Sequence, residues 1–141
     1  MPVRVIYRAT MPVEHTLKVP LSRDQIASIF SFHPSIRFVV IVNKRGAVLD
    51  AVKRAGLQSL EPPQETERIV ERWTIARGLT AGSDEFFGRM KTIIVRREKL
   101  VELLFPSSDQ MVIISAHPAF PLDKTPRLER LLDKLLSEGH Q

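Results

Sequence analysis

The stretch Phe38-Val-Val-Ile-Val42 is apolar at every position, and the turn Asn43-Lys44-Arg45-Gly46 separates it from a second run, Ala47–Val52. A strand with one solvent-exposed face alternates apolar and polar residues. A continuously apolar strand therefore predicts that both faces of its sheet are buried. Gly46 is the residue type that a tight hairpin turn favours. The second run is mixed in character, which predicts an edge strand. Together the two runs predict a β-hairpin in a sheet that helices cover on both sides.

A long helix is predicted after the hairpin, from Gln64 to about Arg77, directly after Pro62-Pro63. Gly78 weakens this helix, and Ser83 is a suitable cap for a short further helix. The apolar residues of the long helix recur at helical spacing and are expected to face the sheet. They are Ile69, Val70, Trp73 and Ala76.

Three strand-like runs and a final helix complete the chain. The runs are Thr92–Val95, Leu100–Phe105 and Met111–Ser115, with charged or polar turns between them. The final helix has Thr125 as its expected N-cap and Pro126 at its first helical position. One face of this helix carries leucines at i, i+3, i+4, i+7 and i+8, which is the clearest periodicity in the chain. They are Leu128, Leu131, Leu132, Leu135 and Leu136.

The chain upstream of the hairpin divides into an arm and a helix. Residues 1–20 are an arm in which Val3–Tyr7 and Thr16–Val19 have strand character, and either an added edge strand or partial disorder fits this arm. The helix begins after Ser22, whose spacing to Gln25 matches a capping box, and it ends at His33-Pro34. Residues 21–141 are therefore expected to form a single domain.

Helix, two strands, long helix, three strands and helix is the element order of the roadblock/longin-like branch of profilin-like folds. Three segments resemble, more specifically, an uncharacterised archaeal family of small roadblock-like proteins: Pro34-Ser-Ile-Arg-Phe38, Arg96-Arg97-Glu98-Lys99 and Phe105-Pro106-Ser-Ser-Asp109. The resemblance covers about Ser22 to Leu136. It implies an α+β fold in which a five-stranded antiparallel sheet, of order 2-1-5-4-3, has the long helix on one face and the terminal helices on the other.

The resemblance also implies a kind of function. Roadblock-like proteins mostly homodimerise, by joining sheets or by packing long helices, and act as scaffold subunits or as partners of small GTPases. No set of catalytic residues carries over to this chain, because the fold has no general catalytic set. The leading interpretation is therefore a non-enzymatic protein–protein interaction module that works as a homodimer.

Composition and motifs narrow the function further. The chain has 141 residues and no cysteine, which excludes disulfides, thiolate zinc sites and cysteine nucleophiles. Its four histidines are scattered, and it contains no glycine-rich phosphate loop. We therefore expect no enzyme activity, no metal and no cofactor. Because no long apolar run and no signal-peptide pattern is present, we expect a cytoplasmic protein without a membrane partner.

The net charge of +5 makes nucleic acid a partner to consider. Positive charge is concentrated in residues 1–57, which hold nine of the 21 basic side chains and only three of the 16 acidic side chains. The pairs Lys44-Arg45 and Arg96-Arg97 are candidate contacts for a protein partner or for phosphates. In the expected strand order these pairs lie at opposite ends of the sheet, which predicts that nucleic acid binds weakly at most.

Trp73, Phe86 and Phe87 are candidate residues of a small-molecule pocket, because related sensory folds hold ligands between helix and sheet. Aromatic residues at helical spacing are more often plain core. Two alternatives to the leading interpretation stay open: a small-molecule-binding sensory domain and a basic nucleic-acid-associated protein.

Overall fold

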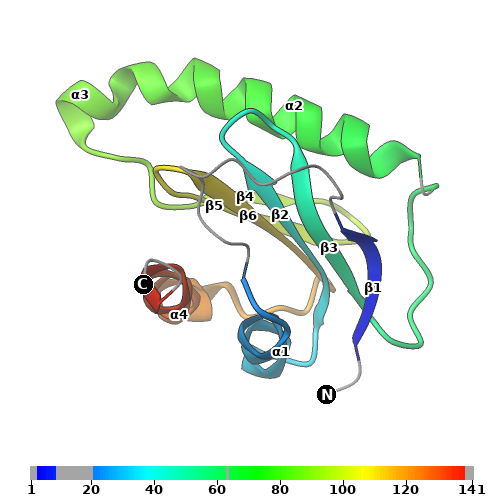
Figure 1. The fold of residues 1–141 in the computed structure, drawn as a ribbon. Helices are drawn as coiled ribbons and strands as arrows, with labels where there is room; N and C mark the ends of the chain where they lie inside the picture. Colours follow the sequence, from blue (N-terminus) through cyan, green and yellow to red (C-terminus); the bar gives the residue numbers. More distant parts are fainter. Residues whose placement is uncertain (1–2, 9–20, 63, 139–141) are drawn as a thin grey trace.

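A computed structural model describes residues 3–8, 21–62 and 64–138. These residues form three layers, with a six-stranded antiparallel sheet between two layers of helices (Figure 1). One helical layer holds the long helix α2 and the short helix α3, and the other holds α1 and α4. The strands are β1 (Val3–Arg8), β2 (Ile36–Asn43), β3 (Val48–Arg54), β4 (Ile93–Arg96), β5 (Val101–Pro106) and β6 (Gln110–Ala116). The helices are α1 (Arg23–Phe32), α2 (Glu65–Thr80), α3 (Asp84–Phe87) and α4 (Thr125–Glu138), with single 3-10 turns η1 (Ala81–Ser83) and η2 (Leu122–Lys124).

The strand order is β1-β3-β2-β6-β5-β4. Its last five members, β3 to β4, have the order expected from the sequence, so the α+β sandwich with a five-stranded antiparallel sheet is confirmed. The expectation that the second hairpin strand lies at an edge is wrong, because β1 pairs with its outer side from Val3 opposite Arg54 to Arg8 opposite Asp50. Thr16–Val19, the other strand-like run of the arm, lies outside the described residues.

Strand β2 is buried along its length, as its apolar sequence predicts. Its side chains alternate between the two faces of the sheet. Val39 and Ile41 belong to the core under α1 and α4, whereas Phe38, Val40 and Val42 belong to the core under α2. The sheet is therefore the wall between two separate hydrophobic cores.

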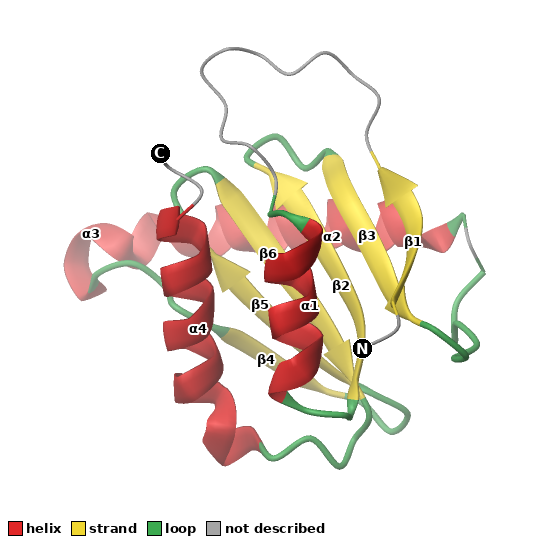
Figure 2. Ribbon diagram, turned by 60° about the horizontal axis from the view of Figure 1, so that its bottom comes forward, coloured by secondary structure: helices red, strands yellow, loops and turns green. Residues whose placement is uncertain are grey.

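Helices α1 and α4 lie side by side over one face of the sheet (Figure 2), and the core beneath them is the larger of the two cores. Helix α1 begins with the expected capping box: Gln25 N–H donates to Ser22 Oγ at 3.1 Å, and Ser22 N–H donates to Gln25 Oε1 at 2.8 Å. Ile26, Ile29 and Phe30 of α1 face the sheet and are buried. The leucine stripe of α4 packs against the same core.

The start of α4 differs from the expectation. Thr125 has helical backbone angles (φ −54°, ψ −43°), because η2 leads directly into α4. An N-cap residue needs an extended backbone, so Thr125 cannot cap this helix. Its Oγ1 atom is buried and has no hydrogen-bond partner among the described residues.

Helix α2 lies across the other face of the sheet, and α3 extends beyond the strands in both ribbon views (Figure 1, Figure 2). Of the four residues expected to face inward, Val70 is buried, while Ile69, Trp73 and Ala76 are half-buried. The hairpin turn between β2 and β3 touches α2. Gly46 has a φ of +90°, and a Cβ atom at this position would lie 3.0 Å from Thr74 Oγ1. A side chain on residue 46 would thus be strained by its backbone angle and crowded by the helix.

Candidate functional site

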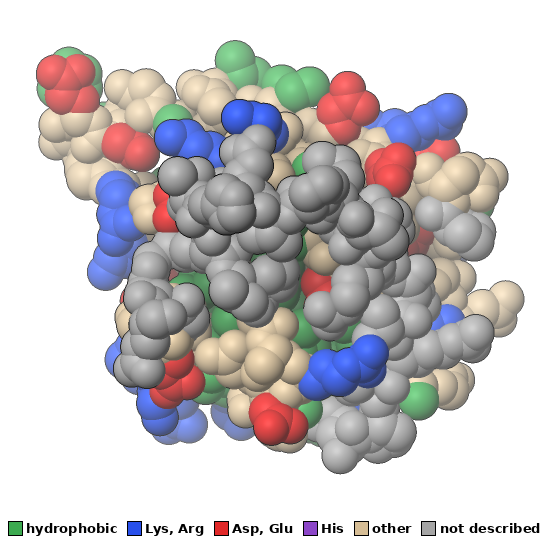
Figure 3. Space-filling model, in the orientation of Figure 1, with side chains coloured by type: hydrophobic (Ala, Val, Ile, Leu, Met, Phe, Trp, Pro, Cys, Tyr) green, Lys and Arg blue, Asp and Glu red, His purple; other side chains and the backbone are tan. Residues whose placement is uncertain are grey.

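The helical segment α2–α3 exposes large hydrophobic side chains. Ile75 is 57% exposed, Leu79 81%, Phe86 77% and Phe87 86%. We call these four residues the α2–α3 apolar surface. Ile75 and Leu79 are four positions apart, so they lie on one side of α2, and the helical period places that side roughly opposite Val70. Hydrophobic side chains reach the molecular surface along α2 in the space-filling view (Figure 3).

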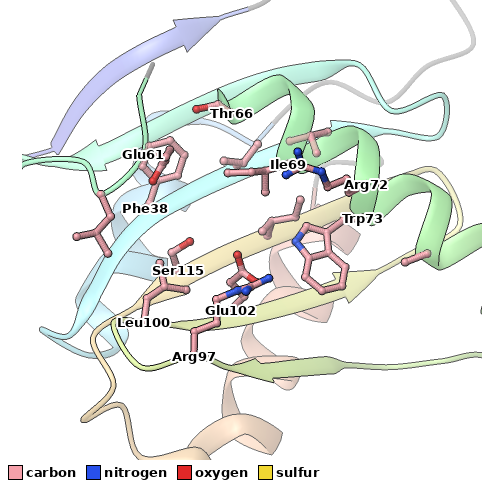
Figure 4. A pocket seen from close by; sticks show the side chains of 15 residues that line it. Phe38, Glu61, Thr66, Ile69, Arg72, Trp73, Arg97, Leu100, Glu102 and Ser115 are labelled. Carbon is pink, nitrogen blue, oxygen red and sulfur yellow. The ribbon is translucent and has the colours of Figure 1, made fainter. Parts of the chain in front are cut away.

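A hollow with a volume of about 570 Å³ lies between α2 and the sheet, and we call it the α2–sheet cavity (Figure 4). Its floor consists of apolar side chains on β2 and β6, among them Phe38, Val40 and Ile113. Its roof comes from α2, where Ile69 and Trp73 turn toward the strands. The cavity exists because α2 contributes few fully buried side chains and does not close down on the strands beneath it.

One end of the α2–sheet cavity is polar. Glu102 of β5 is 7% exposed and points to the α2 face of the sheet, because its neighbours Val101 and Leu103 point to the other core. Arg97 Nε donates to Glu102 Oε2 at 3.3 Å, and the Arg97 side chain itself is 60% exposed. Ser115 of β6 lies opposite Glu102 in the strand register and also lines the cavity.

The aromatic residues singled out from the sequence do not form one pocket. Trp73 lines the α2–sheet cavity, whereas Phe86 and Phe87 are exposed on α3 and are not among its lining residues. The physical reason is the length of the helical segment. Helix α2 continues past Gly78 to Thr80 and is followed by η1, which places α3 beyond the sheet. Ser83 starts the short helix but makes no side-chain cap.

The two basic pairs lie at opposite ends of the sheet. Lys44 and Arg45 occupy the β2–β3 turn, next to the end where Asn43 pairs with Gln110. Arg96 lies at the other end: it pairs with Val101, and Val101 pairs with Ala116, the last residue of β6. Gln110 is the first residue of that strand. Lys44 lines a second hollow of about 360 Å³ with Arg77 and Arg89, and Arg97 lines the α2–sheet cavity. The four side chains therefore do not form one continuous basic groove.

Within the described residues, no cluster of three or more His, Asp or Glu side chains could hold a metal ion. In the same part of the chain, no helix is both long enough and apolar enough to cross a membrane.

Arg54 is a charged residue whose hydrogen bonds hold the fold together. It donates to backbone carbonyls of the α1–β2 region, and partial burial lowers the pKa of its guanidinium.

Sequence analysis missed two features of this region. Ile75 and Leu79 are apolar residues outside the inward stripe of the long helix. Their spacing from that stripe places them on the opposite side of the helix, so the sequence already indicated an exposed apolar side. Glu102 interrupts an otherwise apolar strand, and a lone carboxylate at a core position is a signal of a paired or ligand-facing group. Its partner Arg97 follows from the hairpin geometry of β4 and β5.

Comparison with solved structures identifies the fold. The chain is similar to the gliding protein MglB from Thermus thermophilus, with a TM-score of 0.65 and 12% identity over 89% of this chain and 99% of that chain. A roadblock/LC7 domain from Streptomyces avermitilis gives a TM-score of 0.62 at 12% identity, over 84% of this chain and 94% of that chain. MglC from Myxococcus xanthus gives 0.55 at 14% identity, over 82% and 97%. No protein-family model matches the chain, and no curated protein matches its sequence. The likeness is one of fold, and that fold is the roadblock/LC7 fold.

Proposed function

We propose that this protein is a non-enzymatic regulatory scaffold that works as a symmetric homodimer and holds a further protein. The observation that carries the proposal is the α2–α3 apolar surface, in which four large hydrophobic side chains stand more than half exposed on one helical segment. Soluble proteins seldom concentrate large exposed apolar side chains on one segment unless these side chains meet a partner. The shared fold with roadblock/LC7 domains supports the same function.

A second copy of the chain is the simplest partner for this surface. In a two-fold contact the same patch serves both copies, so the patch must be complementary to itself. The apolar side chains at the C-terminal part of α2 can be complementary to themselves if the two-fold axis of the dimer passes near Leu79. One of the similar structures is described as MglB with a tetrameric arrangement, which supports the proposal that a chain of this fold assembles.

The further partner is proposed to be a protein, with a small GTPase as the first class to test, in line with the resemblance seen in the sequence. Dimerisation through α2–α3 would leave both outer strands, β1 and β4, accessible to it. A short edge strand such as β4 can accept an added strand from a partner.

Light scattering on the purified chain tests the dimer. We expect the wild type at tens of micromolar to have twice the chain mass of 16.1 kDa. Leu79→Asp should give the monomer mass while keeping the circular dichroism spectrum of the folded chain, because residue 79 is 81% exposed within one copy. Its melting temperature should match that of the wild type in dilute solution, where both are monomeric. Ala55→Asp adds the same charge at an exposed site after β3 and should stay dimeric. A monomeric wild type, or a Leu79→Asp variant that remains dimeric, would overturn the proposal.

A further inference from the structure

Beyond assembly, the α2–sheet cavity is a place where a ligand could bind. It is open to water, and a ligand that displaced this water would bury apolar side chains of the helix and of the sheet. Its volume of about 570 Å³ falls within the range of small-molecule sites, roughly 300–1,000 Å³. We propose that this cavity binds a small aromatic carboxylate.

The apolar part of such a ligand matches the body of the cavity. Phe38, Val40 and Ile113 give an apolar floor on the adjacent strands β2 and β6. The Trp73 indole turns from α2 toward the strands (Figure 4) and can stack on an aromatic ring held between helix and sheet. This arrangement favours a planar ring system over a branched or bulky group.

The polar end of the cavity selects the charge of the ligand. Arg97 uses Nε to bind Glu102, which leaves its terminal nitrogens to donate to an anion, because a guanidinium carries five N–H donors. Arg72 and Glu61 also line the cavity with opposite charges, so the Arg97 end decides the sign of the ligand charge. A guanidinium with free N–H donors suits a carboxylate, which accepts paired hydrogen bonds from arginine. The Ser115 hydroxyl, opposite Glu102 on the neighbouring strand, can donate one more.

Glu102 acts here as a positioning residue. Its carboxylate is almost fully buried and holds Arg97 at the cavity end. A ligand cation would have to displace Arg97 from Glu102, whereas a ligand anion leaves that ion pair intact. This difference makes an anion the better fit and gives a direct test of the sign of the ligand charge.

The test uses 2-naphthoate as the probe, with 2-naphthamide and 2-naphthylmethylammonium as neutral and cationic analogues of the same ring. The chain contains one tryptophan, so the indole N–H signal of Trp73 is unambiguous in a proton–nitrogen correlation spectrum of the full chain. We expect 2-naphthoate to shift this signal saturably and to bind about tenfold more tightly than the amide, the equivalent of one charge-assisted contact. Equal binding of all three probes, or no saturable shift up to the solubility limit, would overturn the proposal.

Matched variants locate the site. Arg97→Gln should weaken 2-naphthoate binding about tenfold, whereas Arg96→Gln, an exposed change at the preceding residue that does not line the cavity, should not. Glu102→Gln should also weaken 2-naphthoate binding, because it removes the carboxylate that holds Arg97 at the cavity end. Unchanged binding would show that Glu102 does not position Arg97. Leu79→Asp should bind 2-naphthoate like the wild type, whatever its oligomeric state. Loss of binding in Leu79→Asp would place the probe on the α2–α3 apolar surface and contradict the inference.

Discussion

Arg54 shows how one side chain can tie several elements together. It lies at the end of β3, and its guanidinium donates to three backbone carbonyls: Nε to Ile36 O at 2.7 Å, and Nη2 to Phe30 O at 2.9 Å and His33 O at 3.2 Å. The same group stacks over the Phe30 ring, 5.2 Å from its centroid. Arg54 therefore satisfies carbonyls that the C-terminus of α1 leaves without helical partners.

We expect Arg54→Ala to lower the free energy of unfolding by about 3 kcal/mol, because hydrogen bonds from a charged donor contribute roughly 1.5–3 kcal/mol each and do not add fully. Urea unfolding measures this loss. Burial lowers the pKa of Arg54, but arginine stays charged far above neutral pH, so the loss should be the same in mildly acidic and mildly basic buffer.

Lys53→Ala is the control for Arg54→Ala, since Lys53 is the preceding residue of β3 and is also half-buried. It should cost less than about 1 kcal/mol, the usual effect of a surface substitution. Similar losses in both variants would show that Arg54 does not have the anchoring role that its three hydrogen bonds indicate.

At the scale of elements, local signals predicted the helices and strands well, and long-range pairing less well. The capping box of α1 depends on two residues three positions apart, so Ser22 and Gln25 could be read directly. Strand β1 depends instead on pairing with β3, about 45 residues further along the chain, and no local feature of Val3–Arg8 distinguishes an edge strand from an irregular arm. Thr125 was misread because η2, a single 3-10 turn, has no strong sequence pattern.

A buried leucine on α4 and an exposed leucine on α2 can be compared to test which of the two helices buries its leucine in the hydrophobic core. Leu132 of α4 is 1% exposed and Leu79 of α2 is 81% exposed. Leu132→Ala should lower the free energy of unfolding by about 2–5 kcal/mol, the usual cost of truncating a buried leucine. Leu79→Ala should change it within about 0.5 kcal/mol under conditions in which the chain is monomeric.

Both variants can be compared by thermal and urea unfolding in dilute solution. If Leu132→Ala melts like the wild type, α4 does not pack on its own sheet as described. A large loss in monomeric Leu79→Ala would mean that α2 folds back on its own domain and that its apolar side is not free for a partner.

At the scale of the whole molecule, the strand order was predictable and the cavity was not. The order β3-β2-β6-β5-β4 is the one that the family resemblance implied, and the continuously apolar run Phe38–Val42 independently predicted a strand buried on both faces. The α2–sheet cavity assembles residues from β2, β5, β6 and α2, and it depends on how far the helix stands from the sheet. Helical spacing in α2 fixes which side faces inward, but it does not fix how closely that side approaches.

The distribution of basic charge over the whole molecule leads to a prediction about nucleic acids. Lys44 and Arg45 lie at one end of the sheet, and Arg96 and Arg97 lie at the other. Nucleic acid lying on the first of these ends would meet at most four cations, Lys44 and Arg45 together with Arg77 and Arg89. The association constant should therefore fall by no more than about a hundredfold between 50 and 200 mM salt. We expect weak binding that does not discriminate between DNA sequences, measured by fluorescence anisotropy of labelled oligonucleotides.

Replacing both Lys44 and Arg45 by Glu should abolish this weak binding and leave the melting temperature unchanged, because both side chains are exposed in a turn. Arg96→Glu is the control at the other end of the sheet, and it leaves the ion pair between Arg97 and Glu102 intact. It should reduce binding less if the first turn is the main contact. Sequence-selective binding that persists at physiological salt would instead require a continuous recognition surface, and would make nucleic acid rather than protein the partner of this fold.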